Sequence, residues 1–434
     1  MSGTSKINQS KTMKKLSFIL FLCLGYVAIA QAQTRVTSYD NNNEGRKGTE
    51  NVFLGGAAGS FTIAQGSHNV FMGYQAGLRN NIGSGNVYLG HRAGLTGGTI
   101  GNNVIVGKDA GRFNKAGINV ILGAEAGLSN EGSRNIMLGY QVGTNNTGRY
   151  NIFLGEQAGT NNAGEHNIFM GHQAGLNNKA GKDNTFIGKL AGRDNTTGTN
   201  NLFMGNIAGH RTTTGNNNTF VGMEAGRGNT KGRDNIFMGH QTGFGAMVGN
   251  QNVFIGNSAG RNTSVGSKNV SIGHEAGYNN SLGSSSVFLG YQAGYDETKN
   301  GRLYIANSKT RTLIYGEFYS KKVGINTITP EATLDVNGSM KGHSLTLNVG
   351  SFPDYVFEAG YDLMPLEEVD AYIKKHGHLP KVPKATKVVK EGMNVAQMNV
   401  LLMEKVEELT LYTIALKKEL DQLKQQVNTS TTKK

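Results

Sequence analysis

One short sequence unit is repeated fifteen times between Asn51 and roughly Gly301. Each copy spans 16 to 18 residues and reads Asn, three apolar residues, Gly, two variable residues, Ala and Gly, followed by a polar stretch with another Gly. The copies that begin at Asn69 and Asn151 show the full pattern. A fixed period of this length indicates a solenoid, in which each repeat forms one coil and packs against its neighbours.

The composition of each unit favours β-structure. A three-residue apolar run between Asn and Gly is too short for a helix and is typical of a short strand between turns. The glycines at the fifth and ninth positions allow the chain to turn through positive φ. None of the five prolines precedes Pro330, so no proline removes a ladder donor. We expect an all-β solenoid, a parallel β-roll of about fifteen coils and about 70 Å in length.

The first position of the unit predicts a ladder of side chains. Fourteen of the fifteen copies begin with Asn, and Ser286 is the exception. Stacked in register, the amides of such a column can hydrogen-bond to one another or to turn backbone. The predicted structural ladder comprises Asn69, Asn86, Asn103, Asn119, Asn135, Asn151, Asn167, Asn184, Asn201, Asn218, Asn235, Asn252 and Asn269.

The three apolar residues of each unit raise a question of burial. In a strand the first and third residues face one way and the second faces the other, yet all three are apolar in most copies. We expect one face to fill the narrow coil and the second-position aromatic column to need cover from another rod, because a stripe of that length is exceptional on a monomer. A wider coil that folds over this column is the alternative. The column comprises Phe53, Phe71, Tyr88, Phe153, Phe169, Phe186, Phe203, Phe220, Phe237, Phe254 and Phe288.

The N-terminal segment predicts export. Met13 and two lysines precede a short apolar core from 16 to 29, and Ala32 ends a plausible signal-peptidase site. Residues 1–12 read as an upstream extension. Cys23 falls inside the apolar core, so the mature chain would hold no disulfide, lipid anchor or reactive thiol. No other apolar run approaches the roughly 18 residues of a membrane helix. We expect a protein that is secreted or lies on the outer surface of a bacterium.

The C-terminal segment predicts a coiled coil. From Val395 and Asn399 to Val427, apolar residues recur at alternating spacings of four and three, with charged residues around them. A buried helix in a globular tail is the alternative, and the heptads alone leave dimer and trimer open. The predicted oligomer seam comprises Leu402, Val406, Leu409, Thr413, Leu416, Leu420 and Leu423.

Between repeats and coil the composition changes. Leu303–Ile305, Thr312–Tyr315 and Thr333–Val336 read as short strands, and 365–376 shows helical spacing stopped by Gly377. The predicted organisation is a signal peptide at 1–32, a linker or cap at 33–50, the repeat rod at 51–302, a transition region at 303–350, a small capping region with a helix at 351–392, the coiled coil at 393–427 and a disordered tail at 428–434.

These segments carry two resemblances. The Asn-x-apolar-apolar-Gly-x-x-Ala units resemble the head repeats of trimeric autotransporter adhesins, which form left-handed parallel β-rolls packed three together. The region from Lys322 through Pro330, 333–338, 354–357 and His378 to the final coil is similar to the tail-fibre-like C-terminal region of secreted bacterial repeat proteins. Together they imply a homotrimeric, fibre-like surface protein whose C-terminal region helps three chains to register.

Two departures limit the resemblance. The chain ends in a polar coil and not in the membrane anchor of autotransporters, so we do not expect export by that route. Self-cleaving tail-fibre modules begin with a Ser-Asp and Lys signature, which Phe352 and Pro353 interrupt in the nearest stretch here. We therefore expect no autoproteolysis.

The residues give little sign of catalysis, and we expect no enzyme activity, cofactor or metal. Acidic residues of the repeats sit at scattered positions such as Asp109 and Glu156, without the cluster that a carbohydrate-active β-helix needs. Four histidines share one slot after the strand glycine, but Tyr, Lys, Ala, Glu and Asn fill it elsewhere, which favours a solvated variable position over a metal ladder. These histidines are His91, His172, His240 and His274.

The net charge of +13 has two interpretations. Arginines in the repeat loops and lysines around the short helix favour anionic glycans, surface polymers or, least of all, nucleic acid. The same charge equally serves the solubility of a rod that otherwise carries few charges. We expect a non-enzymatic adhesin that binds surface or glycan ligands multivalently along a homotrimeric rod. The alternatives are a solenoid that binds polysaccharide or ice, which would need a regular Thr column, and a carbohydrate-active enzyme.

Overall fold

The computed structural model describes residues 36–39, 50–62 and 66–431. The predicted signal peptide and Cys23 lie outside the described residues. The chain divides into two compact units, Met1–Ser339 and Met340–Lys434. The first holds all the described strands and the second the described helices.

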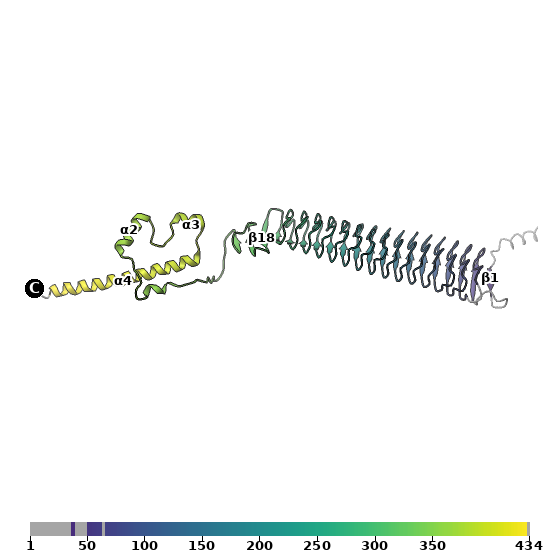
Figure 1. The fold of residues 1–434 in the computed structure, drawn as a ribbon, viewed down its shortest axis with the longest axis horizontal. Coiled ribbons are helices and arrows are strands. Elements are labelled where there is room, and N and C mark those ends of the chain that lie inside the picture. Colours follow the sequence, from purple (N-terminus) through teal and green to yellow (C-terminus); the bar gives the residue numbers. More distant parts are fainter. Residues whose placement is uncertain (1–35, 40–49, 63–65, 432–434) are drawn as a thin grey trace, which may run out of the picture. The chain divides into compact units, whose positions relative to one another are not determined.

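The first unit is a parallel β-solenoid (Figure 1). Each repeat contributes one strand of three or four residues, so fifteen strands from β2 to β16 match the fifteen predicted coils. The strands are β1 Val36–Tyr39, β2 Asn51–Leu54, β3 Val70–Met72, β4 Val87–Leu89, β5 Val104–Val106, β6 Val120–Leu122, β7 Ile136–Leu138, β8 Ile152–Leu154, β9 Ile168–Met170, β10 Thr185–Ile187, β11 Leu202–Met204, β12 Thr219–Val221, β13 Ile236–Met238, β14 Val253–Ile255, β15 Val270–Ile272, β16 Val287–Leu289, β17 Arg302–Ala306, β18 Thr312–Glu317, β19 Lys322–Ile325 and β20 Leu334–Val336.

The repeat strands pair in chain order. Each strand from β2 to β16 is parallel to the next, and equivalent positions of successive repeats face each other, as Phe186 faces Phe203. The ends differ: β1 pairs antiparallel with β2, and β18 pairs antiparallel with β17 and β19. This in-register stacking confirms the predicted solenoid, although β19 was not expected from the sequence.

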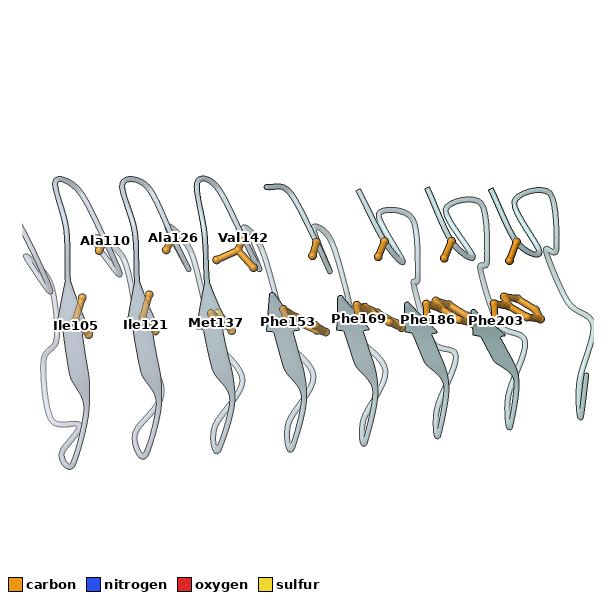
Figure 2. Close-up of a cluster of buried hydrophobic side chains, with 14 of the residues drawn as sticks. Ile105, Ala110, Ile121, Ala126, Met137, Val142, Phe153, Phe169, Phe186 and Phe203 are labelled. Atoms are coloured by element: carbon orange, nitrogen blue, oxygen red, sulfur yellow. The ribbon is translucent and has the colours of Figure 1, made fainter. Parts of the chain in front are cut away.

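The aromatic column lies inside the coils, which corrects the prediction that it needs cover from another rod. The second residue of nearly every apolar triplet is fully buried within its own chain, and the most exposed member of the column, Phe53, is only 3% exposed. Figure 2 shows Phe153, Phe169 and Phe186 stacked inside successive coils, in the same column as Ile105, Ile121 and Met137. Ring centroids of neighbouring coils lie 4.7 to 5.2 Å apart from Phe153 to Phe254. The wider coil was therefore the correct alternative, because the chain closes over the rings through the turn.

Two glycines of each repeat make this closure possible. Gly209 has φ +56, and a Cβ there would lie 2.4 Å from the Phe203 ring, so only Gly lets the turn pass over the ring. Gly205 has φ +139, and a Cβ there would lie 2.3 Å from the carbonyl oxygen of Gly222 in the next coil. Gly205 and its equivalents thus permit close stacking of coils, and Gly209 and its equivalents permit burial of the aromatic ring.

The second unit holds the helices (Figure 1). They are the 3₁₀ helix η1 Pro353–Phe357 and the α-helices α2 Leu366–His376, α3 Ala385–Glu391 and α4 Val395–Thr431. The predicted helix at 365–376 corresponds to α2, which ends at Gly377 with φ 73. The segment predicted as a coiled coil forms α4, which continues beyond Val427.

Candidate functional site

The asparagine column forms a continuous hydrogen-bonded ladder. The backbone N–H of Asn218 donates to Oδ1 of Asn201 at 3.0 Å, and Nδ2 of Asn201 donates to the carbonyl of Gly215 at 2.8 Å. The same backbone-to-Oδ1 bond joins successive coils from Asn51 to Ser286. All thirteen predicted ladder asparagines are buried, so this column holds the coils together and does not face a ligand.

A second buried asparagine column was missed in the sequence. Nδ2 of Asn146 donates to Oδ1 of Asn130 at 2.8 Å, and Asn162 repeats the contact with Asn146. These residues follow the first column at a spacing of 11, a signal that is visible in the sequence. Thr62, Thr212 and Thr263 replace Asn in some coils, which weakens that signal.

The outer face of the repeat sheet is apolar, because the first and third residues of each apolar triplet point out of the coil. All of these residues are Val, Ile, Leu or Met except Thr185 and Thr219. We call this surface the sheet face. Exposure reaches 45% at Ile136 and Leu138 and 42% at Met238.

The size of the sheet face is unusual for a monomer. Fifteen strands about 4.8 Å apart, with three residues of about 3.3 Å each, give a face of roughly 700 Å². The largest apolar patch of an ordinary monomer covers a few hundred Å². The sequence correctly indicated an uncovered apolar stripe but assigned it to the wrong residues.

The four histidines of the shared slot do not converge. His91 stacks on Tyr74 with centroids 5.4 Å apart, and His274 stacks on Tyr291 at 5.2 Å. Within 36–39, 50–62 and 66–431, no three His, Cys, Asp or Glu side chains come together as a group that could hold a metal ion. The slot therefore presents partly exposed side chains of varied chemistry along the rod.

The predicted oligomer seam lies on α4 and is exposed to solvent. Leu402, Val406, Leu409, Thr413, Leu416, Leu420 and Leu423 are all exposed, with fractions of 53% at Leu402 and 63% at Leu409. The seam also forms one wall of a groove of about 380 Å³ with Met364, Leu366 and Leu379.

The opposite, polar side of α4 packs on its own chain. Glu404 is 5% exposed and accepts hydrogen bonds from Tyr355 Oη at 2.8 Å and Lys381 Nζ at 2.6 Å. Tyr361 Oη donates to Glu408 Oε1 at 2.6 Å. Burial acts to raise the pKa of Glu404, but the hydrogen bonds from Lys381 and Tyr355 outweigh it and hold the pKa below its usual range. The helix thus buries charged groups within the chain and leaves its apolar side open.

Comparisons with known proteins returned no relative: no family model, curated protein or solved structure matches the chain. In the part of the chain that the structure describes, no helix combines the length and apolarity needed to cross a bilayer.

Proposed function

We propose that the protein is a non-enzymatic, exported fibre of three identical chains that acts as an adhesin on the outer surface of a bacterium. The observation that carries this proposal is the sheet face, a continuous apolar surface along fifteen coils of one chain. Export and the bacterial surface rest on the N-terminal sequence pattern alone.

Assembly from copies of the same chain explains two open surfaces at once. Among the described residues the sheet face remains partly exposed along the repeats, and the heptad seam of α4 is exposed apart from the groove that it lines. Heptad seams pack against equivalent helices. A closed symmetric assembly covers the same surface on every copy, which suits a repeated face better than a partner of different sequence. Three chains follow from the resemblance to trimeric adhesin heads.

Adhesion follows from what the assembled rod still presents. The slots after the two repeat glycines vary from coil to coil and remain partly exposed. Many weak sites on one rigid body bind a surface far more tightly than each site alone, because later contacts form at high effective concentration. Such a rod needs no deep pocket.

An ice-binding solenoid is less well supported. A flat ice-binding surface would need a regular outward Thr column, whereas the sheet face carries Val, Ile, Leu and Met with Thr at 185 and 219. The apolar character favours association with protein over contact with ice.

The test compares two matched lysine substitutions in the full chain. Met238 lies on the sheet face and Met247 lies in a turn, with exposures of 42% and 50%. Met238→Lys would bury a charge between copies, so we expect a lower mass in solution and at least tenfold weaker attachment of protein-coated beads to cells or matrix. Met247→Lys should change neither.

Two results would contradict the proposal. Bead attachment that is unchanged when Met238→Lys has separated the chains would show that assembly is not needed for adhesion. A reproducible hydrolytic activity of the intact rod would replace the adhesin with an enzyme.

A further inference from the structure

One slot of the repeat changes its chemistry halfway along the rod. In the seven coils from Gly77 to Gly175, the residue that follows the second glycine is Leu or Thr, with Arg112 as the exception. From Gly192 onward the same slot carries only cationic or aromatic side chains. These are Arg193, His210, Arg227, Phe244, Arg261, Tyr278 and Tyr295, which we call the arginine ladder.

Neighbouring members of the arginine ladder are in contact from Arg227 to Tyr295. Phe244 lies between two guanidinium groups, with Cζ of Arg227 and Cζ of Arg261 each 5.1 Å from its ring centroid. Arg261 also donates from Nη1 to Tyr278 Oη at 2.9 Å, and Tyr278 stacks on Tyr295 at 4.8 Å. Beyond the last rung, Nζ of Lys309 lies 4.7 Å from the Tyr295 centroid.

The coil does not require these residues. Leu78, Leu95, Leu128 and Leu176 occupy the same slot on coils with the same strand pairing and turn hydrogen bonds. The arginine ladder is therefore an addition to the solenoid and not a condition for its folding.

The contacts fix how the arginine ladder meets solvent. The face of Phe244 is covered by Arg227 and Arg261, and Tyr278 is covered by Arg261 and by the Tyr295 ring. The side chains of Arg193 and Arg227 remain 39% and 36% exposed. Guanidinium groups held between rings lose less conformational freedom on binding an anion than free arginines do.

Charge alternates along the arginine ladder. Arg193, Arg227 and Arg261 occupy every second rung, so their charges recur at about 9.5 Å, twice the spacing of parallel strands. His210 lies between Arg193 and Arg227; burial lowers its pKa, and these arginines lower it further against the opposing effect of Asp194. From Arg193 to Arg261, positive rungs therefore alternate with neutral ones, and two neutral rungs follow.

The flanks of the arginine ladder supply donors and acceptors for hydroxyl groups. On one side Gln241 Nε2 donates to Glu224 Oε2 at 2.7 Å, and on the other Asn262 Nδ2 donates to Asn279 Oδ1 at 2.8 Å. Two carboxylates lie beside the ladder: Glu224 is 3.4 Å from Arg227, and Asp194 is 3.8 Å from Arg193. A polymer with an anion at every unit would meet these carboxylates, whereas a polymer of hydroxyl-rich units with spaced anions would not.

We propose that the arginine ladder binds an acidic polysaccharide whose carboxylates are separated by neutral sugars, laid along the rod. Two rungs match the length scale of a disaccharide, and guanidinium edges pair with carboxylates through two parallel N–H donors. Single-stranded nucleic acid fits less well, because its bases need open ring faces on which to stack. This assignment rests on the proposed adhesive function and names a ligand class for it.

The experiment measures binding of the full chain to hyaluronan, a polymer with one carboxylate per disaccharide, by electrophoresis in gels that contain it. We expect the wild-type protein to be retarded, and Arg227→Leu/Arg261→Leu to weaken binding at least tenfold. The double variant Arg112→Leu/Arg134→Leu removes the same charge outside the arginine ladder and should bind like wild type. Arg227→Lys/Arg261→Lys keeps the positive charge but lacks the paired N–H donors of the guanidinium, so it should bind with intermediate strength.

Fold and specificity are measured in parallel. The melting temperature of the Arg227→Leu/Arg261→Leu variant should stay close to wild type, because Leu already fills this slot in other coils. Failure of hyaluronan to retard the wild-type protein would overturn the proposal. So would equal losses in the two leucine double variants, or ladder-dependent binding of oligo(dT) or polyglutamate as tight as that of hyaluronan.

The same proteins separate this proposal from the adhesin proposal. Attachment to cells without binding to hyaluronan would refute the arginine ladder as a polysaccharide site and leave the adhesin standing. Binding to hyaluronan in solution without attachment to any surface would do the reverse.

Discussion

At the scale of single residues, Ser271 interrupts the aromatic column. It occupies the position that Phe254 and Phe288 hold in the neighbouring coils, and its buried hydroxyl has no hydrogen-bond partner. The buried apolar core divides at this coil into two clusters. Phe288 leans toward the gap, because a Cβ at Gly277 in the Ser271 coil would lie 2.7 Å from its ring.

Replacement of Ser271 by Ile should stabilise the rod. Ile fills this position at Ile105 and Ile121, where it is fully buried. The change removes an unpaired hydroxyl and adds buried apolar surface, which we expect to raise the free energy of unfolding by about 1 to 3 kcal/mol. The midpoint of denaturant unfolding measures the effect. A lower midpoint would show that Phe288 already fills the gap.

The asparagine ladder gives a second residue-scale prediction. Asn201→Ala leaves the N–H of Asn218 and the carbonyl of Gly215 without their partners, at a cost of about 1 to 3 kcal/mol. Asn201→Ser should cost less, because Ser286 shows that a hydroxyl can accept the equivalent N–H, from Arg302 at 3.1 Å. Hydrogen exchange of the Asn218 amide measures both. Equal exchange in the two variants would contradict the role given to Oδ1.

At the scale of elements, α4 is held to its own chain by the Glu404 carboxylate. The pKa of Glu404 is lower in the folded chain than its usual value, so its stabilising effect is present above about pH 4.3 and is lost as the pH falls through the folded pKa. Glu407 has the opposite effect on how stability depends on pH, because burial, Asp354 and Glu404 raise its pKa. A Glu404 variant separates the two effects.

We expect Glu404→Gln to loosen the start of α4 at neutral pH. The variant weakens the contacts with Lys381 and Tyr355, each at a charged acceptor, for a loss of about 2 kcal/mol. Protection of α4 amides from hydrogen exchange, corrected for intrinsic rates, should differ between wild type and variant at pH 7 and converge near pH 3. A difference that persists at low pH would contradict the ionised state as the cause.

At the scale of the whole molecule, much of the fold follows from the period of the sequence, while the side of the strand that is buried does not. The repeat glycines, the Asn column and the apolar triplet predict the coils and their register. Because all three residues of the triplet are apolar, the sequence pattern does not show which side of the strand is buried. The second residue is the buried one because Gly209 and its equivalents let the turn close over its ring. The arginine ladder was equally hidden, because its contacts join residues 17 apart.

Other copies of the chain are proposed to cover the sheet face and the α4 seam. The absolute mass of the mature protein in solution tests this assembly most directly. Light scattering should give three times the mass of one chain, and a chain that ends before Val395 should dissociate or misassemble because it lacks the seam. A single-chain mass for both proteins would contradict this assembly, because the apolar sheet face, about 700 Å² in footprint, would then have no cover from another copy.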